Sequence, residues 1–90
     1  MPNITSIQSS AFEGCTNLNS IDLSNITSIG NSAFYGCTDI SSINLSNITS
    51  IDYGAFQECT NLSSVVGLNN PSLGERVFRM CTSLAQIDLG

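Results

Sequence analysis

The sequence predicts a leucine-rich repeat solenoid of four 22-residue coils, an α/β-type repeat in which short parallel β-strands alternate with short helical or 3₁₀ turns. Three observations predict it: a pattern recurs every 22 residues without a gap, each repeat contains Ala or Val followed by Phe-x-x-Cys-Thr, and Leu or Ile recurs at fixed positions. Such a period is typical of solenoids whose coils bury their apolar faces against their neighbours. We expect one domain over 1–90, with repeats at approximately 3–24, 25–46, 47–68 and 69–90.

The segment after each Cys predicts a strand. In the second repeat it reads Ile40-Ser-Ser-Ile43-Asn-Leu45, and its last three residues alternate with the strand period of two. Residues between the apolar positions should therefore face solvent on the concave side of the sheet. The candidate contact residues are Ser20, Asp22, Ser42, Asn44, Ser64, Val66, Gln86 and Asp88.

The other half of each repeat begins with an Asn-containing turn, because Asn bonds the local backbone and tolerates left-handed conformations. An Ile-x-x-Ile pair, such as Ile26 and Ile29, then predicts a short extended segment on the opposite side. The Ala-Phe element that follows predicts a short helical or 3₁₀ turn. We expect the Phe residues of successive coils to stack as an aromatic spine.

Charge narrows the classes of partner. Seven acidic residues against two basic ones give a net charge of −5, and the chain has neither Lys nor His. This balance argues against nucleic acid and anionic membrane surfaces, both of which need clustered basic residues. No apolar run approaches the roughly 20 residues that cross a bilayer. The N-terminal residues do not resemble a signal peptide.

The four Cys occupy one repeat position, Cys15, Cys37, Cys59 and Cys81. Stacked residues lie about 4.8 Å apart, whereas a disulfide prefers about 3.8 Å between Cβ atoms. A collinear row also cannot supply a tetrahedral metal shell. We therefore expect free buried thiols and no metal or cofactor.

No constellation predicts catalysis. The Ser columns have no His or Lys to activate a nucleophile, and Asp22 and Asp88 are expected about three strands apart, too far for a carboxylate pair. Glu75, Arg76 and Arg79 form the only mixed-charge cluster, which is interpreted as a surface ion pair. Five Asn-x-Ser/Thr sequons are interpreted as a by-product of turn Asn residues in a Ser/Thr-rich repeat.

The order Ile-x-x-Ile-Gly-x-x-Ala-Phe-x-x-Cys-x-x-Leu-x-x-Ile-x-Leu, clearest over 26–45, resembles the BspA-like (Treponema pallidum-type) leucine-rich repeat family. The resemblance covers essentially the whole chain, although the family more usually has a period of 23. It implies a noncatalytic extracellular or cell-surface module that binds a host matrix or cell-surface protein. It carries no catalytic or fixed binding residues to this chain.

Residues 3–90 make four whole repeats, and neither end has an obvious cap. The chain is therefore expected to be a segment of a longer array or an uncapped subunit. The second possibility predicts a structural protein whose copies stack head to tail into a filament. The candidate end-stacking residues are Ile4, Ile7, Phe12, Phe78, Leu84, Ile87 and Leu89.

Overall fold

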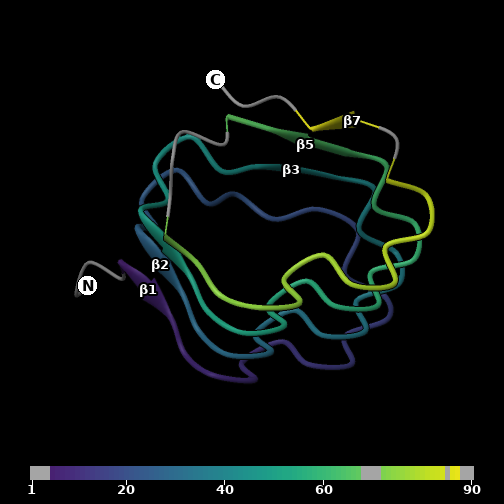
Figure 1. Cartoon of the computed structure of the whole chain (residues 1–90), viewed down its shortest axis with the longest axis horizontal. Helices are drawn as coiled ribbons and strands as arrows, with labels where there is room; N and C mark the ends of the chain where they lie inside the picture. Colours follow the sequence, from purple (N-terminus) through teal and green to yellow (C-terminus); the bar gives the residue numbers. More distant parts are fainter. Residues whose placement is uncertain (1–4, 68–71, 85, 88–90) are drawn as a thin grey trace.

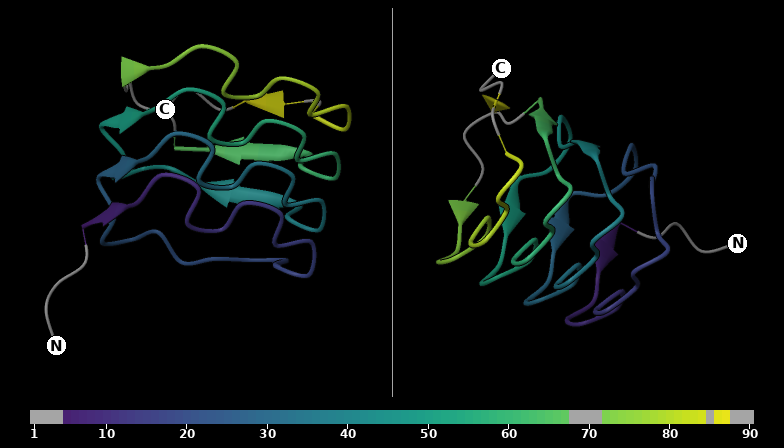
Figure 2. Two further views of the ribbon diagram at one scale, coloured as in Figure 1. Left: turned by 90° about the horizontal axis from the view of Figure 1, so that it is seen from below. Right: turned by 90° about the vertical axis from the view of Figure 1, so that its right-hand side faces the viewer.

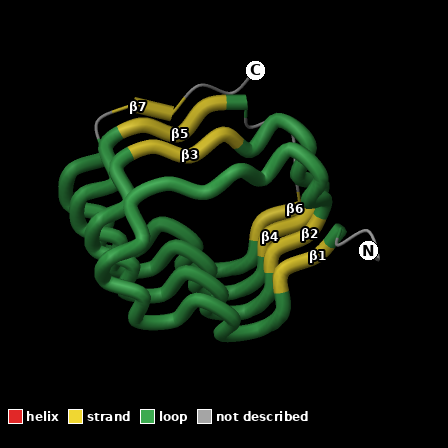
Figure 3. Tube along the Cα trace, turned by 180° about the vertical axis from the view of Figure 1, so that it is seen from behind, coloured by secondary structure: helices red, strands yellow, loops and turns green. Residues whose placement is uncertain are grey.

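The computed structural model describes residues 5–67, 72–84 and 86–87, which wind as stacked coils with parallel strands on two sides (Figures 1 and 3). Four strands form one sheet in the order β1-β2-β4-β6, and three form another in the order β3-β5-β7. The strands are β1 (Ser6–Ile7), β2 (Ser28–Ile29), β3 (Ser42–Asn44), β4 (Ser50–Ile51), β5 (Ser64–Val66), β6 (Ser72–Leu73) and β7 (Gln86–Ile87). The parallel strands agree with the predicted solenoid.

Strand pairing follows the sequence repeat. Ser6 pairs with Ser28, Ser28 with Ser50, and Ser50 with Ser72. Each step is 22 residues, so equivalent residues lie directly above one another along the stack (Figure 2). This pairing holds because β1, β2 and β4 each place a Ser beside a more deeply buried Ile, and a slip of one residue would turn these Ile side chains outward.

The first repeat departs from the expected strand. Ser20 and Asp22 lie in a segment that is not part of either described sheet. The backbone bonds from Ser63 to Ser41 and from Leu45 to Val66 join β3 to β5, but the described residues form no equivalents between the first repeat and β3. A hollow of about 110 Å³ separates them instead. β1 of the same repeat still pairs with β2, so the departure is confined to the segment around Ser20 and Asp22.

The Ala-Phe segment is not helical, and the described residues contain no helix. In the first repeat the N–H groups of residues 11, 13 and 15 bond three residues back, while those of residues 10, 12 and 14 bond to the second repeat. Ser10 and Gly14 have φ values of 59° and 73°. A 3₁₀ helix needs successive local bonds and negative φ throughout. The segment is therefore a series of turns in which every second backbone N–H donates to the neighbouring repeat.

The Phe spine forms as predicted. Successive ring centroids lie 5.4, 5.0 and 5.8 Å apart, with interplanar angles of 10° or less. Phe34 and Phe56 are completely buried, whereas Phe12 and Phe78 are half-buried because each stacks on one ring only. The core therefore lies in the middle repeats and thins toward both ends.

Candidate interaction surfaces

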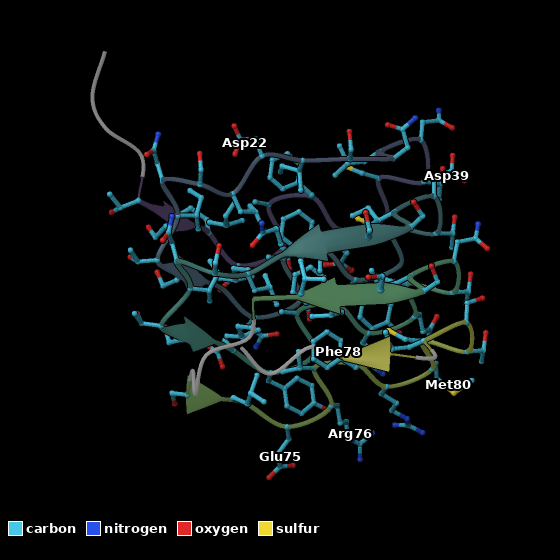
Figure 4. The ribbon with its side chains drawn as sticks, turned by 90° about the horizontal axis from the view of Figure 1, so that it is seen from above. Asp22, Asp39, Glu75, Arg76, Phe78 and Met80 are labelled. Carbon is cyan, nitrogen blue, oxygen red and sulfur yellow. The ribbon has the colours of Figure 1, made fainter. Side chains whose placement is uncertain are left out.

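The predicted outward residues of β3 and β5 do face solvent. In β3, Ser42 and Asn44 are exposed on either side of buried Ile43. In β5, Ser64 is half-buried and Val66 exposed around buried Val65. Figure 4 shows these strands side by side, seen from above. Because successive side chains of a strand point to opposite faces of the sheet, every second residue of β3 and β5 faces outward, as expected for a half-buried sheet.

Five of the eight candidate contact residues line one shallow groove of about 350 Å³, together with Ile21 and Ile43. We call these five the hydroxyl strip: Ser20, Ser42, Asn44, Ser64 and Val66. Gln86 pairs with Ser64 in the strand register, and Asp88 lies outside the described residues. The strip carries no charged side chain, which suits the centre of a protein interface better than its rim.

Asp22 and Asn44 have a local structural role that the sequence analysis missed. The Asp22 carboxylate accepts a hydrogen bond from the Ser24 N–H at 2.9 Å, and the Asn44 side-chain oxygen accepts the Ser46 N–H at 3.0 Å and its hydroxyl at 2.7 Å. The backbone bond lowers the pKa of the Asp22 carboxyl. Both residues thereby shape the turn after the strand. The signal was an Asp or Asn two residues before Ser, the pattern of an Asx turn.

A second shallow groove, of about 320 Å³, runs across the four-stranded sheet. Its polar lining comes from Asp52 and from Ser28, Ser50 and Ser72, which occupy one repeat position. This groove was not among the predicted surfaces, although the Ser-Ile alternation at this position was a signal for it in the sequence. Both sheets therefore offer a shallow face lined by Ser hydroxyls together with apolar side chains.

The expected ion pair in the fourth repeat does not form within the described part of the chain, where Glu75 has no Arg nitrogen within 4.0 Å. Figure 4 shows Glu75 and Arg76 projecting from one end of the stack, while Asp22 and Asp39 lie toward the other. The two basic residues are therefore available to a partner at the fourth-repeat end.

The two end surfaces expose apolar side chains. Leu73 is 50% exposed, although Ile29 and Ile51 at the same repeat position are only 2% exposed. Four candidate end-stacking residues are half-buried: Ile7, Phe12, Phe78 and Leu84. Of the other three, Ile87 lies in β7, and Ile4 and Leu89 lie outside the described residues. A further coil at either end would cover this apolar surface.

The Cys column forms free thiols, as expected. Three of them donate to the carbonyl oxygen of a Phe in the preceding repeat: Cys37 to Phe12, Cys59 to Phe34 and Cys81 to Phe56, at 3.1, 3.2 and 3.1 Å. Burial is the main cause that raises the pKa of Cys37 and Cys81, and it raises the pKa of Cys59 to about 12. No group of metal-binding side chains lies among the described residues.

This burial predicts an order of thiol reactivity. In the native protein at pH 8, we expect iodoacetamide to modify the half-buried Cys15 first and Cys59 last, because the thiolate is the nucleophile and a thiol with a pKa near 12 is almost wholly protonated. Peptide mass spectrometry of timed samples measures the order. All four should react alike in denaturant, and early modification of native Cys59 would contradict the buried ladder.

The described residues include no helix long and apolar enough to cross a membrane. A protein-family model described as "BspA type Leucine rich repeat region (6 copies)" matches residues 1–90. Searches of the curated proteins and of the solved structures found no match to the chain. The family match confirms the resemblance predicted from the Ile-x-x-Ile, Ala-Phe and Cys positions.

Proposed function

The chain belongs to the BspA-type leucine-rich repeat family, and from this premise we propose that it is a noncatalytic adhesion module that binds a matrix or cell-surface protein. Repeats of this family are generally protein-interaction modules and are often found in surface proteins. An extracellular or cell-surface location is part of the proposal.

The hydroxyl strip is the observation that carries the proposal. It presents three Ser hydroxyls, one amide and one Val along a groove of about 350 Å³ that spans the parallel strands β3 and β5 and the Ser20 segment of the first repeat. Small hydroxyl and amide side chains form adaptable hydrogen bonds with a protein surface. Val66, which is 38% exposed, adds an apolar contact. The strip therefore suits a protein partner with a polar, uncharged contact surface.

The test compares two double variants of equal net charge. Ser42→Arg/Val66→Glu alters the strip, and Ser6→Arg/Ser72→Glu alters exposed residues of the opposite sheet as the matched control. Binding to immobilised extracellular-matrix proteins is measured by interferometry. We expect the strip variant to lose about tenfold or more in affinity for a protein that the unaltered chain binds, because buried mismatched charge is costly at an interface. Equal loss in both variants would contradict the assignment.

A second candidate is a self-assembling structural subunit whose copies stack head to tail. The exposure of Leu73, against the burial of its equivalents Ile29 and Ile51, favours it, because a further coil would bury Leu73 in the same way. The half-buried Phe12 and Phe78 rings would likewise gain a second neighbour. Ile7→Asp should then abolish polymers, since it places a charge in the contact.

A further inference from the structure

We propose that copies of this chain join head to tail in the 22-residue register of the coils, with Glu13 of one copy paired to Arg79 of the copy before it. This inference rests on the stacking role proposed above and adds the polarity, the register and a charged pair at the junction. Three independent features of the two end repeats carry it: backbone groups, apolar surface and charge.

The backbone groups of the turn side fix the polarity. Between the first and second repeats, three N–H groups donate forward along the stack: Ser10 to Asn31, Phe12 to Ala33 and Gly14 to Tyr35, at 2.8, 2.8 and 2.7 Å. The same three bonds recur at the next two junctions. The fourth repeat continues this series with the N–H groups of Arg76, Phe78 and Met80. The first repeat offers the matching carbonyl groups of Ser9, Ala11 and Glu13.

Within the part of the chain that the structure describes, none of these six groups has a backbone partner. A first repeat placed after a fourth repeat would join three donors to three acceptors, as at every internal junction. Two fourth repeats placed together would instead oppose donors to donors. Unpaired backbone groups at a buried contact are costly. The contact is therefore directional.

On the sheet side, the backbone hydrogen bonds between repeats run in the opposite direction along the stack. There the later repeat donates backward, from Gly30 to Ile7 at 2.9 Å and from Gly74 to Ile51 at 2.7 Å. By the same pattern, the Gln8 N–H of a following copy would meet the Leu73 carbonyl of the copy before it. Neither group has a backbone partner among the described residues. Each end thus presents the donors and acceptors that the other end lacks.

The charged residues of the two end repeats favour the same register for the head-to-tail contact. Glu13 and Arg79 occupy one repeat position and are both exposed. In adjacent coils such residues lie about 4.8 Å apart, so a head-to-tail junction places a carboxylate beside a guanidinium. Side chains at this edge do reach between coils, since the Tyr35 hydroxyl donates to Glu58 Oε2 at 2.9 Å. Shifting the register by one residue would separate both the charges and the Phe rings.

The test uses two charge reversals, Arg79→Glu and Glu13→Arg, in the full chain. Both residues are exposed, so circular dichroism should show an unchanged fold. Sedimentation velocity at low salt measures association. Each variant alone places like charges at every junction, and we expect it to associate about tenfold more weakly than the unaltered chain. In an equimolar mixture, a polymer in which the two variants alternate has an opposite-charge pair at every junction. Association should therefore return.

The outcomes separate this inference from the stacking role itself. If the unaltered chain associates and each single variant associates equally well, stacking stands and the Glu13–Arg79 register is wrong. If the unaltered chain stays monomeric at all concentrations, both proposals are wrong. Recovery in the mixture, reduced by added salt, supports the paired register because screening weakens exposed charge pairs.

Discussion

Phe56→Ala should lower the free energy of unfolding by about 3–5 kcal/mol, the largest loss expected from any single truncation in this chain. Phe56 has no exposed surface and stacks on Phe34 at 5.0 Å and on Phe78 at 5.8 Å. Its removal leaves a cavity between two rings that are fixed by neighbouring coils. Small domains are stable by only about 5–15 kcal/mol, so much of the variant should be unfolded in mild urea.

Urea unfolding followed by far-ultraviolet circular dichroism measures this loss. Phe12→Ala is the matched control, because Phe12 is half-buried and stacks on one ring. We expect the control to lose about 1–2 kcal/mol, in proportion to its smaller buried area. Equal losses for Phe12 and Phe56 would contradict a core that is concentrated in the middle repeats.

Gly30→Ala should cost about 1–3 kcal/mol, which is the usual range for a side chain forced into filled space. A Cβ at Gly30 would lie 2.7 Å from Ser9 N and 2.9 Å from both Gln8 C and Ile7 O. These are backbone atoms and cannot rotate away. The variant must therefore separate the first and second repeats where the Gly30 N–H bonds the Ile7 carbonyl at 2.9 Å.

Gln8→Ala is the control for this substitution, since Gln8 occupies the same repeat position in the first repeat and is exposed. Its unfolding free energy should stay within about 0.5 kcal/mol of the unaltered protein. The third repeat has Asp52 at this position, so a Cβ is accommodated at the next junction. The prediction concerns only the contact of Gly30 with Ile7, Gln8 and Ser9. Full stability of Gly30→Ala would show that these coils are not in close contact.

Features that depend on the repeat itself were predictable from the sequence. A residue with an equivalent in the coils on both sides meets nearly the same surroundings in each repeat, so one pattern predicts many contacts. This is why the Phe stack, the free Cys ladder and the outward positions of β3 and β5 were all predicted. The hydroxyl strip follows from the same alternation of inward and outward side chains.

Features that depend on backbone conformation were not predicted. Glu58 and Met80 have φ values of 63° and 64°, although non-Gly residues rarely adopt this region. Gly14 and Gly36 occupy the same repeat position in the first two repeats, with φ values of 73° and 74°. That pair was a signal for a left-handed turn in place of the expected helical one.

Features of the end repeats also escaped prediction, because the sequence pattern is the same whether or not a neighbour is present. Ser20 and Asp22 carry the strand pattern but lie outside the described sheets. Leu73 carries the inward pattern of Ile29 and Ile51 but is half exposed. Periodicity predicts which side of a coil a residue occupies, and the neighbouring coil decides whether that side is covered.

The central claim is that each coil presents backbone donors, backbone acceptors and apolar side chains that the neighbouring coil pairs or covers. At the two ends, another copy of the chain takes the place of that neighbour. Light scattering after size-exclusion chromatography, with negative-stain microscopy of the same sample, tests it most directly on the unaltered chain. Strand spacing predicts filaments with an axial repeat of about 19 Å per copy, four times the distance between paired strands. Monodisperse monomers at every concentration, or polymers with an unrelated axial repeat, would contradict the claim.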